Sequence, residues 1–402
     1  MQRTSLSLAI VFASIASQAG AGGFALNEQS ISALGTANSG RTATAIDAST
    51  AYNNPAAMMQ LKQAQFTQAV AFIDAQTKIT NVAGGFPGGT ADGDIVPHTF
   101  VPSGYYTSGD KGGWAWGLAA YGSFGLKTNY EPSFGGRVYG DKSDVKVTTI
   151  QPTLSYQVND TISIGIGPTI NKIEAYLSSD VGFPAQQVVS LEGDKIAYGY
   201  NVGVHANLSE KTQAGLVYRS KVTYNIKGEI NGAAPFSIPA RTSVTTPESV
   251  ELGISHALSP TLTAHAGAVW TRWSRLQALN VSSILGDAGS EEFAWENTWG
   301  AALGLSKQVN DKFVLRAGLA YDRTPVTEEH LSVRLPSGNR RIATFGVGYH
   351  ISKNQTIDFT YAYLDESKRN VDKQPSLAVP VPYSATYKNT ASLYGLQFTQ
   401  RF

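Results

Sequence analysis

Cysteine is absent from the 402 residues, and charged residues and long apolar runs are scarce. The lack of cysteine excludes disulfides, thiolate metal sites and catalysis by a cysteine nucleophile. Asp, Glu, Lys and Arg make up 15% of the chain, against about 25% in soluble globular proteins. A formal net charge of +1 gives no electrostatic basis for binding nucleic acid. After the N-terminal segment, no stretch approaches the roughly 18 consecutive apolar residues of a transmembrane helix.

Glycine and aromatic residues are abundant instead. The chain contains 40 Gly, 19 Tyr, 16 Phe and 6 Trp, yet its mean hydropathy is slightly negative, at -0.14. Aromatic side chains favour strands, and the negative mean hydropathy indicates that they are mixed with polar residues. The composition therefore indicates an aromatic-rich β protein.

Residues 1–21 are expected to form a cleaved signal peptide. Arg3 supplies a positive charge, residues 6–13 form a short apolar run, and three small residues end at Ala21. Cleavage after Ala21 would make Gly22 the first residue of the mature chain. The protein is therefore expected to be exported.

Beyond residue 61, apolar and polar residues alternate over many segments of about nine or more residues. Because successive strand side chains point to opposite faces, each segment predicts a strand with one apolar and one polar face. A soluble β-sandwich shows the same alternation, so the pattern alone does not identify the solvent. The segments are Thr149–Val158, Ile162–Asn171, Ile196–Leu208, Val250–Leu258, Trp299–Leu305, Phe313–Tyr321, Ala343–Ile351 and the last residues from Tyr394 to Phe402.

The lengths of the connections favour a membrane barrel. Short turns alternate with long connections, as periplasmic turns alternate with extracellular loops in outer-membrane barrels. Lipid also requires such a sheet to close. The predicted fold is therefore all-β, a transmembrane antiparallel β-barrel of about 14 strands. Turns are expected at 109–112, 159–160, 209–210, 259–260, 310–311 and 353–354, and long connections near 81–95, 131–145, 178–193, 230–243, 281–292, 326–339 and 368–386.

Residues 22–61 differ from the rest of the chain. They are rich in small residues, contain few charges and show no sustained alternation. An irregular segment that precedes an array of strands predicts an N-terminal hatch, or plug, inside the barrel formed by residues 62–402.

Aromatic residues near the predicted strand ends are expected to form interfacial girdles. The chain ends on Phe402, and its last strand resembles those that the barrel-assembly machinery of the outer membrane recognises. That machinery is therefore an expected partner. The girdle residues are Trp114, Trp116, Trp270, Trp273, Tyr361 and Tyr363.

Several segments resemble the FadL family, outer-membrane transporters of long-chain fatty acids and other hydrophobic compounds. No single motif is specific, but their order extends from the signal peptide to Phe402. The similar segments are Gly23–Gln29, Ala48–Ala57 with its Asn-Pro-Ala sequence, Phe124–Tyr130, Leu191–Asp194, Tyr198–Gly203, Thr246–Gly253, Trp270–Ser274, Leu315–Pro325 and 334–337.

The resemblance implies a fourteen-stranded barrel with a hatch, a monomer in the Gram-negative outer membrane among lipid and lipopolysaccharide, with no cofactor. It implies passive uptake: ligand is captured among extracellular loops, passes to an apolar pocket near the mature N-terminus and leaves sideways where the third strand kinks. Long-chain fatty acids are the expected substrate, and monoaromatic or other hydrocarbons the alternative. The implied site residues are Phe24 and Leu26 at the pocket, Asp47, Asn54, Pro55 and Ala56 in the hatch, and Gly122, Phe124 and Gly125 at the kink.

Charged and apolar residues elsewhere suggest further contacts. Arg316 or Lys172 would neutralise a carboxylate headgroup. Alternatively, lumenal Arg and Asp residues pair with each other and tie the hatch to the wall, with Asp47 as one partner. The apolar loop residues Phe183 and Val188 are expected to form part of an outer capture groove.

Two other functions fit the sequence less well. An enzyme is not expected, because the six His residues lack metal-ligand spacing and no Gly-x-Ser-x-Gly sequence occurs. Ser255 and His256 are adjacent in a predicted strand, so they face opposite ways. A general diffusion porin would need an open, charged lumen and no plug.

Overall fold

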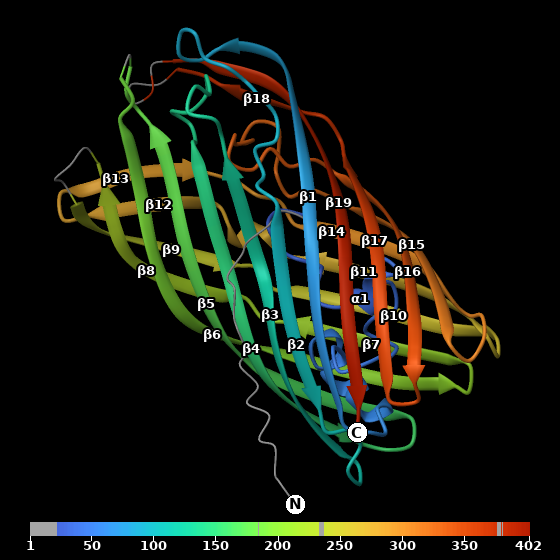
Figure 1. Cartoon of the computed structure of the whole chain (residues 1–402). Coiled ribbons are helices and arrows are strands. Elements are labelled where there is room, and N and C mark those ends of the chain that lie inside the picture. Colours follow the sequence, from blue (N-terminus) through green and yellow to red (C-terminus); the bar gives the residue numbers. More distant parts are fainter. Residues whose placement is uncertain (1–21, 184, 233–236, 376–378, 380) are drawn as a thin grey trace, which may run out of the picture.

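The computed structural model describes residues 22–183, 185–232, 237–375, 379 and 381–402. The protein is a tall β-barrel with tilted strands and a small, partly helical segment inside it (Figure 1). The expected signal peptide, residues 1–21, lies outside the described residues. Within the described ranges, no helix has the length and apolar character needed to cross a membrane.

The barrel wall is one closed antiparallel sheet. Strand β1 pairs with β2 on one side and with β19 on the other, so the first and last strands meet. Five wall strands are interrupted and consist of two segments each, namely β7–β8, β9–β10, β11–β12, β13–β14 and β17–β18. The barrel therefore has 14 strands, as predicted.

The segments of the wall have the following bounds: β1 Gln65–Gly84, β2 Thr99–Thr107, β3 Trp114–Asn129, β4 Lys142–Gln157, β5 Ile162–Asp180, β6 Val188–Ser209, β7 Thr212–Arg219, β8 Val222–Asn231, β9 Ser237–Thr246, β10 Ser249–Ser259, β11 Leu262–Thr271, β12 Ala278–Ser283, β13 Gly286–Glu292, β14 Thr298–Gln308, β15 Phe313–Asp322, β16 Arg340–Ser352, β17 Gln355–Glu366, β18 Arg369–Lys373 and β19 Tyr383–Arg401.

Side chains of the wall point alternately outward and inward. In β6, Ile196 and Tyr198 are exposed on the outer face, whereas Asn201 and His205 are buried inside the barrel. The apolar outer face and polar inner face follow the predicted alternation, and this arrangement suits a wall surrounded by lipid. Phe402 is exposed at the end of the barrel that carries the turns, and its role in assembly stays a prediction.

The two ends of the barrel differ in their connections. Strands are joined at all six of the predicted turns. At the opposite end, long loops were expected at 178–193, 230–243 and 281–292, and this prediction is wrong. Strands β5 and β6 pair as far as Asp180 and Val188, β8 and β9 pair through much of the second segment, and β12 and β13 form a hairpin. Where a strand extends beyond the membrane, both faces meet water, so the alternation that reveals a strand is lost.

The hatch, residues 22–61, lies inside the barrel, mostly toward the turns (Figure 1). It contains the short helices α1 (Ile31–Leu34) and α2 (Thr50–Asn53) and the 3-10 helix η1 (Pro55–Gln60). Asn54 caps η1, since its side-chain oxygen accepts the Ala56 N–H at 3.0 Å. Proline at the first helical position suits this start because its φ is already fixed.

A ring of inward-facing glycines surrounds the hatch. Beside Gly203, Gly215 and Gly318, a β-carbon would collide with hatch atoms, so the hatch can approach the wall only where side chains are missing. The register aligns these positions, as Gly215 lies opposite Gly253 and Gly304 lies opposite Gly318. We name this set the glycine belt, and its members are Gly165, Gly203, Gly215, Gly253, Gly304, Gly318, Gly346 and Gly395.

The substitution Gly215→Ala is expected to destabilise the barrel. The added methyl group meets the carbonyl oxygen of Thr42, a backbone atom that cannot rotate away, and overpacking of this kind costs about 1–3 kcal/mol. The thermal unfolding midpoint of the purified protein in detergent, followed by electrophoretic mobility, should fall. Gly104→Ala is the matched control, because space is open beside Gly104 in β2. Equal midpoints for the two variants would contradict the role of the belt.

Candidate functional site

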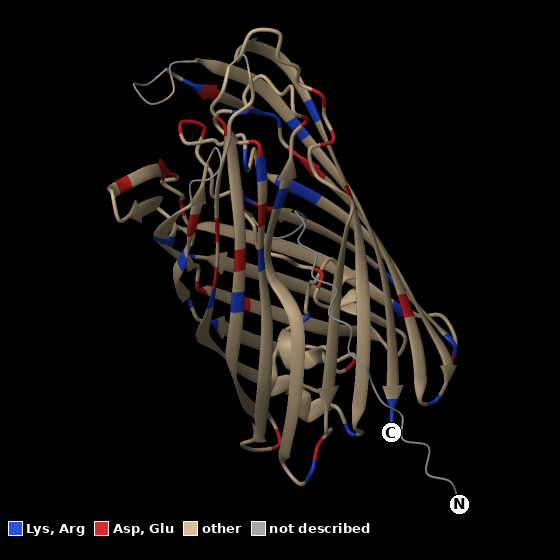
Figure 2. Ribbon diagram, turned by 60° about the vertical axis from the view of Figure 1, so that its left-hand side comes forward, with Lys and Arg blue, Asp and Glu red and all other residues tan. Residues whose placement is uncertain are grey.

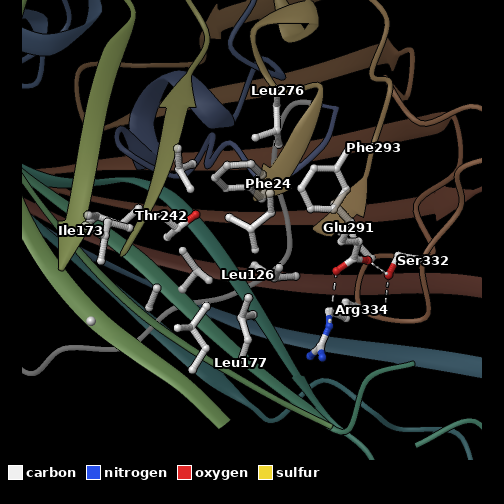
Figure 3. Close-up of a pocket in the computed structure, with 18 of the residues that line it drawn as sticks. Phe24, Leu126, Ile173, Leu177, Thr242, Leu276, Glu291, Phe293, Ser332 and Arg334 are labelled. Atoms are coloured by element: carbon white, nitrogen blue, oxygen red, sulfur yellow. Dashed lines mark hydrogen bonds and ion pairs between the residues drawn. The ribbon is translucent and has the colours of Figure 1, made fainter. Parts of the chain in front are cut away.

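An apolar cavity lies between the hatch and the end of the barrel that carries the long connections (Figure 3). It contains about 1020 Å³ of space not filled by atoms, part of it open to solvent. Strands β3, β4, β5, β6, β8, β9, β12 and β13 and the loop before β16 contribute to its lining. Its apolar lining residues include Phe24, Leu126, Val145, Ile173, Ala175, Leu177, Leu191, Ile226, Val244, Leu276, Phe293, Trp295, Val326 and Leu335.

Phe24 is one of the aromatic residues in the lining of this cavity. Its ring centroid lies 5.5 Å from that of Phe124, 5.3 Å from Trp273 and 5.9 Å from Trp295. Gly23 has a positive φ of 79°, and a β-carbon there would lie 2.9 Å from both tryptophan rings. The chain must therefore have glycine beside Phe24 to fit this aromatic cluster.

Trp273 is not part of an interfacial girdle, and that prediction is wrong. Its side chain is fully buried in the lumen against Phe24, whereas Trp270 is exposed on the outer face. Strand β11 ends at Thr271, and the chain turns inward in the 3-10 helix η2 (Trp273–Arg275). The break in the strand therefore places the second tryptophan on the opposite side of the wall.

The far end of the cavity is polar and holds Glu291, Ser332 and Arg334 (Figure 3). The Ser332 hydroxyl donates to Glu291 at 2.7 Å, and the Arg334 guanidinium lies 3.7 Å from the same carboxylate. Arg334 also donates to the hydroxyl oxygens of Ser179 at 2.8 Å and Ser143 at 3.2 Å. Burial lowers the pKa of Arg334, but an arginine stays protonated. The cavity thus combines an apolar body with a cationic end.

Strand β3 loses its neighbour at the residues predicted for the kink. Among the described residues, β2 and β3 pair only between Gly104–Thr107 and Gly117–Ala120, although β3 continues to Asn129. A register shift interrupts the pairing of β3 with β4 between Gly122 and Phe124. The wall therefore has a gap in its hydrogen bonding between β2 and β3, beyond Ala120.

The first residues of the hatch, 22–29, bind to this irregular part of β3, and we name them the N-terminal arm. Gly125 N–H donates to Phe24 O at 2.8 Å, and Leu26 N–H donates to Ser123 O at 3.1 Å. The Gln29 amide donates to Gly122 O at 3.0 Å. The arm thus touches both the cavity, through Phe24, and the gap in the wall. Leu26 packs against Gly122 and does not line the apolar cavity.

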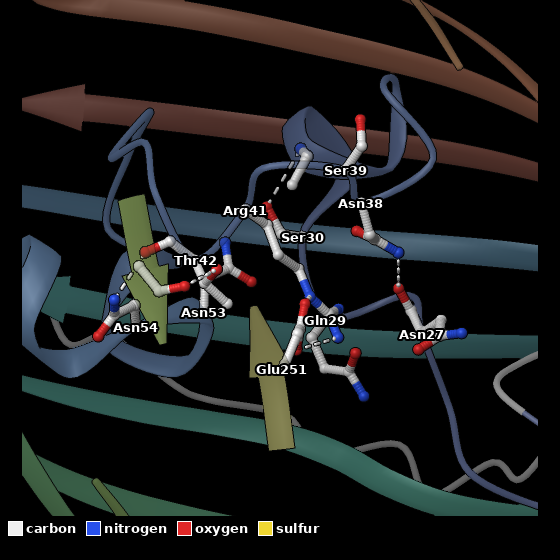
Figure 4. Close-up of polar contacts among 12 residues, drawn as sticks. Asn27, Gln29, Ser30, Asn38, Ser39, Arg41, Thr42, Asn53, Asn54 and Glu251 are labelled. Carbon is white, nitrogen blue, oxygen red and sulfur yellow. Dashed lines mark hydrogen bonds and ion pairs between the residues drawn. The ribbon is translucent and has the colours of Figure 1, made fainter. Parts of the chain in front are cut away.

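Buried ion pairs fasten the hatch to the opposite side of the wall (Figure 4). Arg41 of the hatch donates to Glu251 of β10 at 2.6 Å, and Arg219 of β7 donates to the same carboxylate at 2.7 Å. Burial by itself disfavours the charged form of Arg41, but the Glu251 carboxylate outweighs this effect and raises the Arg41 pKa. Pairing of lumenal charges between hatch and wall was one of the two predicted alternatives.

The Asn-Pro-Ala sequence contacts three wall strands. The Asn54 amide donates to Thr42 O within the hatch at 2.6 Å and to Val204 O of β6 at 3.1 Å. The Ala56 carbonyl accepts hydrogen bonds from the hydroxyl groups of Ser155 on β4 and Ser163 on β5. Pro55 lies between them and packs beside the glycine belt.

Asp47 does not pair with an arginine, so that prediction is wrong. One of its carboxylate oxygens accepts the Gln397 amide at 2.8 Å and the Ser32 hydroxyl at 2.5 Å. The other accepts the Ser49 N–H at 2.8 Å. Asp47 therefore links two parts of the hatch to β19 through neutral donors.

Neither predicted carboxylate-binding cation lies at the cavity. Arg316 is buried beneath Gly35 of the hatch and pairs with Asp358 at 2.6 Å. Lys172 lies on the outer face of β5, because Asn171 and Ile173 on either side of it point inward, and it pairs with Glu174 at 3.3 Å. Both residues are therefore excluded from the lining, and the arginines that line the cavity are Arg334, which is buried, and Arg241, which is exposed.

Phe183 and Val188 lie at the end of the barrel with the long connections, where both are exposed. The Phe183 ring stacks on Phe86 at 5.7 Å, and the Arg137 guanidinium lies 4.3 Å from the Phe86 ring centre. These contacts leave an apolar surface open to water at the outer end of the barrel.

Sequence reasoning missed the residues that complete the site, namely Trp273, Trp295, Arg334, Arg41 and Glu251. Two signals were available. Trp270 and Trp273 are three residues apart, so they could not share one face of a strand. Glu251 lay at an inward position of a predicted strand, where a buried carboxylate requires a cation. Arg334 lies in a loop, where alternation gives no orientation.

Comparisons with known proteins agree with this architecture. A family model described as "Outer membrane protein transport protein (OMPP1/FadL/TodX)" matches residues 12–402. Outer membrane protein P1 of Haemophilus influenzae is 28% identical, and the alignment covers 96% of each chain. The long-chain fatty acid transport protein of Escherichia coli K12 is 26% identical, with 99% of this chain and 98% of that protein covered.

Solved structures share the fold. A Pseudomonas aeruginosa FadL homologue has a TM-score of 0.88 at 22% identity, covering 94% of this chain and all of that one. The Ralstonia pickettii toluene transporter TbuX has a TM-score of 0.63 at 17% identity, and the match covers 90% of this chain and 96% of that one.

The closed barrel and its whole-length relatives define an outer-membrane transport protein and not an enzyme. Within that class, the chain belongs to the OMPP1/FadL/TodX family.

The substitution Glu251→Gln is expected to loosen the hatch. It leaves Arg41 and Arg219 buried without a counter-charge, and breaking a buried pair in this way costs about 3–5 kcal/mol. Ion conductance of the protein in planar bilayers should rise as the hatch separates from the wall. Glu296→Gln, which removes the exposed partner of Arg323, is the control and should leave conductance unchanged. A closed Glu251→Gln channel would show that the ion pairs do not hold the hatch.

Proposed function

We propose that the chain takes up long-chain fatty acids, and that ligand moves from the outer loops into the apolar cavity and leaves sideways between β2 and β3. The observation that carries this proposal is the amphipathic shape of the cavity, with an apolar body ending at Phe24 and Arg334 at the other end. The family membership and a relative named as a long-chain fatty acid transport protein support it.

The cavity suits an acyl chain with a carboxylate head. Each buried methylene group favours an apolar environment by about 0.8 kcal/mol, so the lining holds the chain. The carboxylate replaces Glu291 as the partner of Arg334, which is feasible because the 3.7 Å separation of that pair is longer than a hydrogen bond. Phe183 and Val188 provide the apolar surface for first capture at the outer end.

Release is coupled to the N-terminal arm. A ligand that reaches the floor of the cavity displaces Phe24, and the arm then gives up its hydrogen bonds to Ser123 and Gly125. The gap between β2 and β3 becomes free, and the ligand enters the surrounding lipid without crossing water. Transport on this route needs no energy source other than the ligand gradient.

The substrate class is tested by uptake in a strain that lacks its own transporter of this family. Expression of the chain should raise oleate uptake about tenfold, with little change for toluene, because toluene has no carboxylate to bind Arg334. Ala175→Trp, which fills the cavity, should abolish the gain, whereas Ala301→Trp on the lipid-facing side of β14 should not. Toluene uptake without oleate uptake would favour the monoaromatic alternative, and no gain for either would refute transport.

The sideways route is tested by locking the arm to β3. Ala25 and Phe124 form an antiparallel bridge, so Ala25→Cys with Phe124→Cys places two thiols at a spacing that suits a disulfide. In this cysteine-free chain, oxidation should lower oleate uptake about tenfold or more, and reduction should restore it. The reduced protein is the matched control. Equal uptake in both states would show that ligand leaves by another route.

A further inference from the structure

Charges on the outer face of the barrel are concentrated beyond the apolar band. Figure 2 shows that many of the Lys, Arg, Asp and Glu residues lie toward the end with the long connections and at the opposite turns, with others in between. Three basic residues within four adjacent wall strands (β1, β19, β17 and β16) share the outer face there, and we name them the basic rim. They are Lys78 on β1, Lys388 on β19 and Arg341 on β16.

The basic rim brings like charges together. Lys78 and Lys388 are directly opposite each other in the register of β1 and β19. Like charges in this position destabilise a sheet unless an anion lies between them. Asp365 on β17 is opposite Arg341 and is already paired with Lys388 at 2.5 Å. A second acid, Asp94, lies near Lys78, because its N–H donates to Thr77 O at 3.3 Å. Among the described residues, neither Lys78 nor Arg341 has a hydrogen-bond or ion-pair partner.

Some cations at the same end of other strands are compensated. On the outer face of β4 and β5, Lys146 and Lys172 both contact Glu174, at 3.2 and 3.3 Å. Glu296, just before β14, and Arg323, just after β15, form a 2.9 Å contact. Compensation differs between strands, however, because Lys227 on β8 and Arg241 on β9 are also opposite each other and have no ion-pair partner among the described residues.

Aromatic residues fix the position of the basic rim relative to the membrane. On the same strands, Phe72, Tyr394 and Tyr361 form a contiguous outward-facing cluster, with ring centroids 6.3 and 5.3 Å apart. Such a cluster marks the boundary of the hydrocarbon layer. Lys78 and Lys388 lie farther along β1 and β19 toward the long connections, so they face the headgroups of the outer leaflet.

We propose that the basic rim binds a phosphate group of lipopolysaccharide in the outer leaflet. The phosphate lies between Lys78 and Lys388 and draws Arg341 toward it, which removes the repulsion between the opposed lysines. The exposed amide of Gln76, two residues before Lys78 on β1, lies on the same face and donates a further hydrogen bond to a phosphate oxygen.

The proposal is tested with the full-length protein in detergent, by titration with bisphosphorylated lipid A and native mass spectrometry. Lys78→Gln with Arg341→Gln should weaken binding about fivefold per cation removed, roughly 25-fold together. Both side chains are exposed, so the variant should fold. Lys146→Gln with Lys172→Gln removes two compensated cations at the same end and should change binding less than twofold.

Two further lipids, dephosphorylated lipid A and phosphatidylglycerol, test whether the basic rim recognises the phosphate of lipopolysaccharide. Lipid A from which both phosphates have been removed should bind the wild-type protein as weakly as bisphosphorylated lipid A binds the Lys78 and Arg341 variant. Equal binding of lipid A with and without phosphates, or equal losses in the two double variants, would overturn the phosphate site. Phosphatidylglycerol that binds the basic rim as tightly as lipid A would overturn the assignment to lipopolysaccharide.

Discussion

Close contact between the hatch and the wall is the constraint on which this structure depends. A barrel of 14 strands encloses more space than wall side chains alone can fill, and the hatch fills the remainder only where the wall lacks side chains. The glycine belt provides that clearance on many strands at matching register. The strand pairing of the wall and the position of the hatch are therefore set together, because a slip by one residue would turn each glycine outward.

Two parts of the hatch are bound to the wall by different kinds of contact. The segment around Arg41 and Asn54 is fixed by buried ion pairs and by hydrogen bonds to β4, β5 and β6. The N-terminal arm has no ion pair among the described residues and is held by hydrogen bonds, two of them backbone bonds to an irregular stretch of β3 and the others with side chains, including those of Ser103 and Tyr105 on β2 and Arg340 on β16. One part can therefore stay in place as a seal while the other moves, provided that the ligand displaces Phe24 from its aromatic neighbours.

The sequence predicted the architecture well because the membrane imposes one rule on each strand, namely that apolar residues facing lipid alternate with polar residues facing the lumen. Alternation, turn positions and the number of strands all followed from that rule. Prediction from this alternation failed beyond the membrane, where β12 and β13 meet water on both faces. It also failed at Trp273, where the chain leaves the strand. The partners in the buried ion pairs could not be predicted from the sequence, for a different reason. Alternation along a strand shows that Arg219, Arg316 and Glu251 point inward, but only the pairing of the folded strands shows which charges meet. The predicted partners of Asp47 and Lys172 were therefore wrong.

The N-terminal arm takes part in the floor of the cavity and in the edge of the gap at the same time. On the proposed route, one set of residues would serve every molecule that passes, and a second ligand would have to wait until the arm had returned. Flux on that route would level off as the external ligand concentration rises, whereas flux through an open pore grows in proportion to the concentration. Such a transporter would serve the cell best when its ligand is scarce.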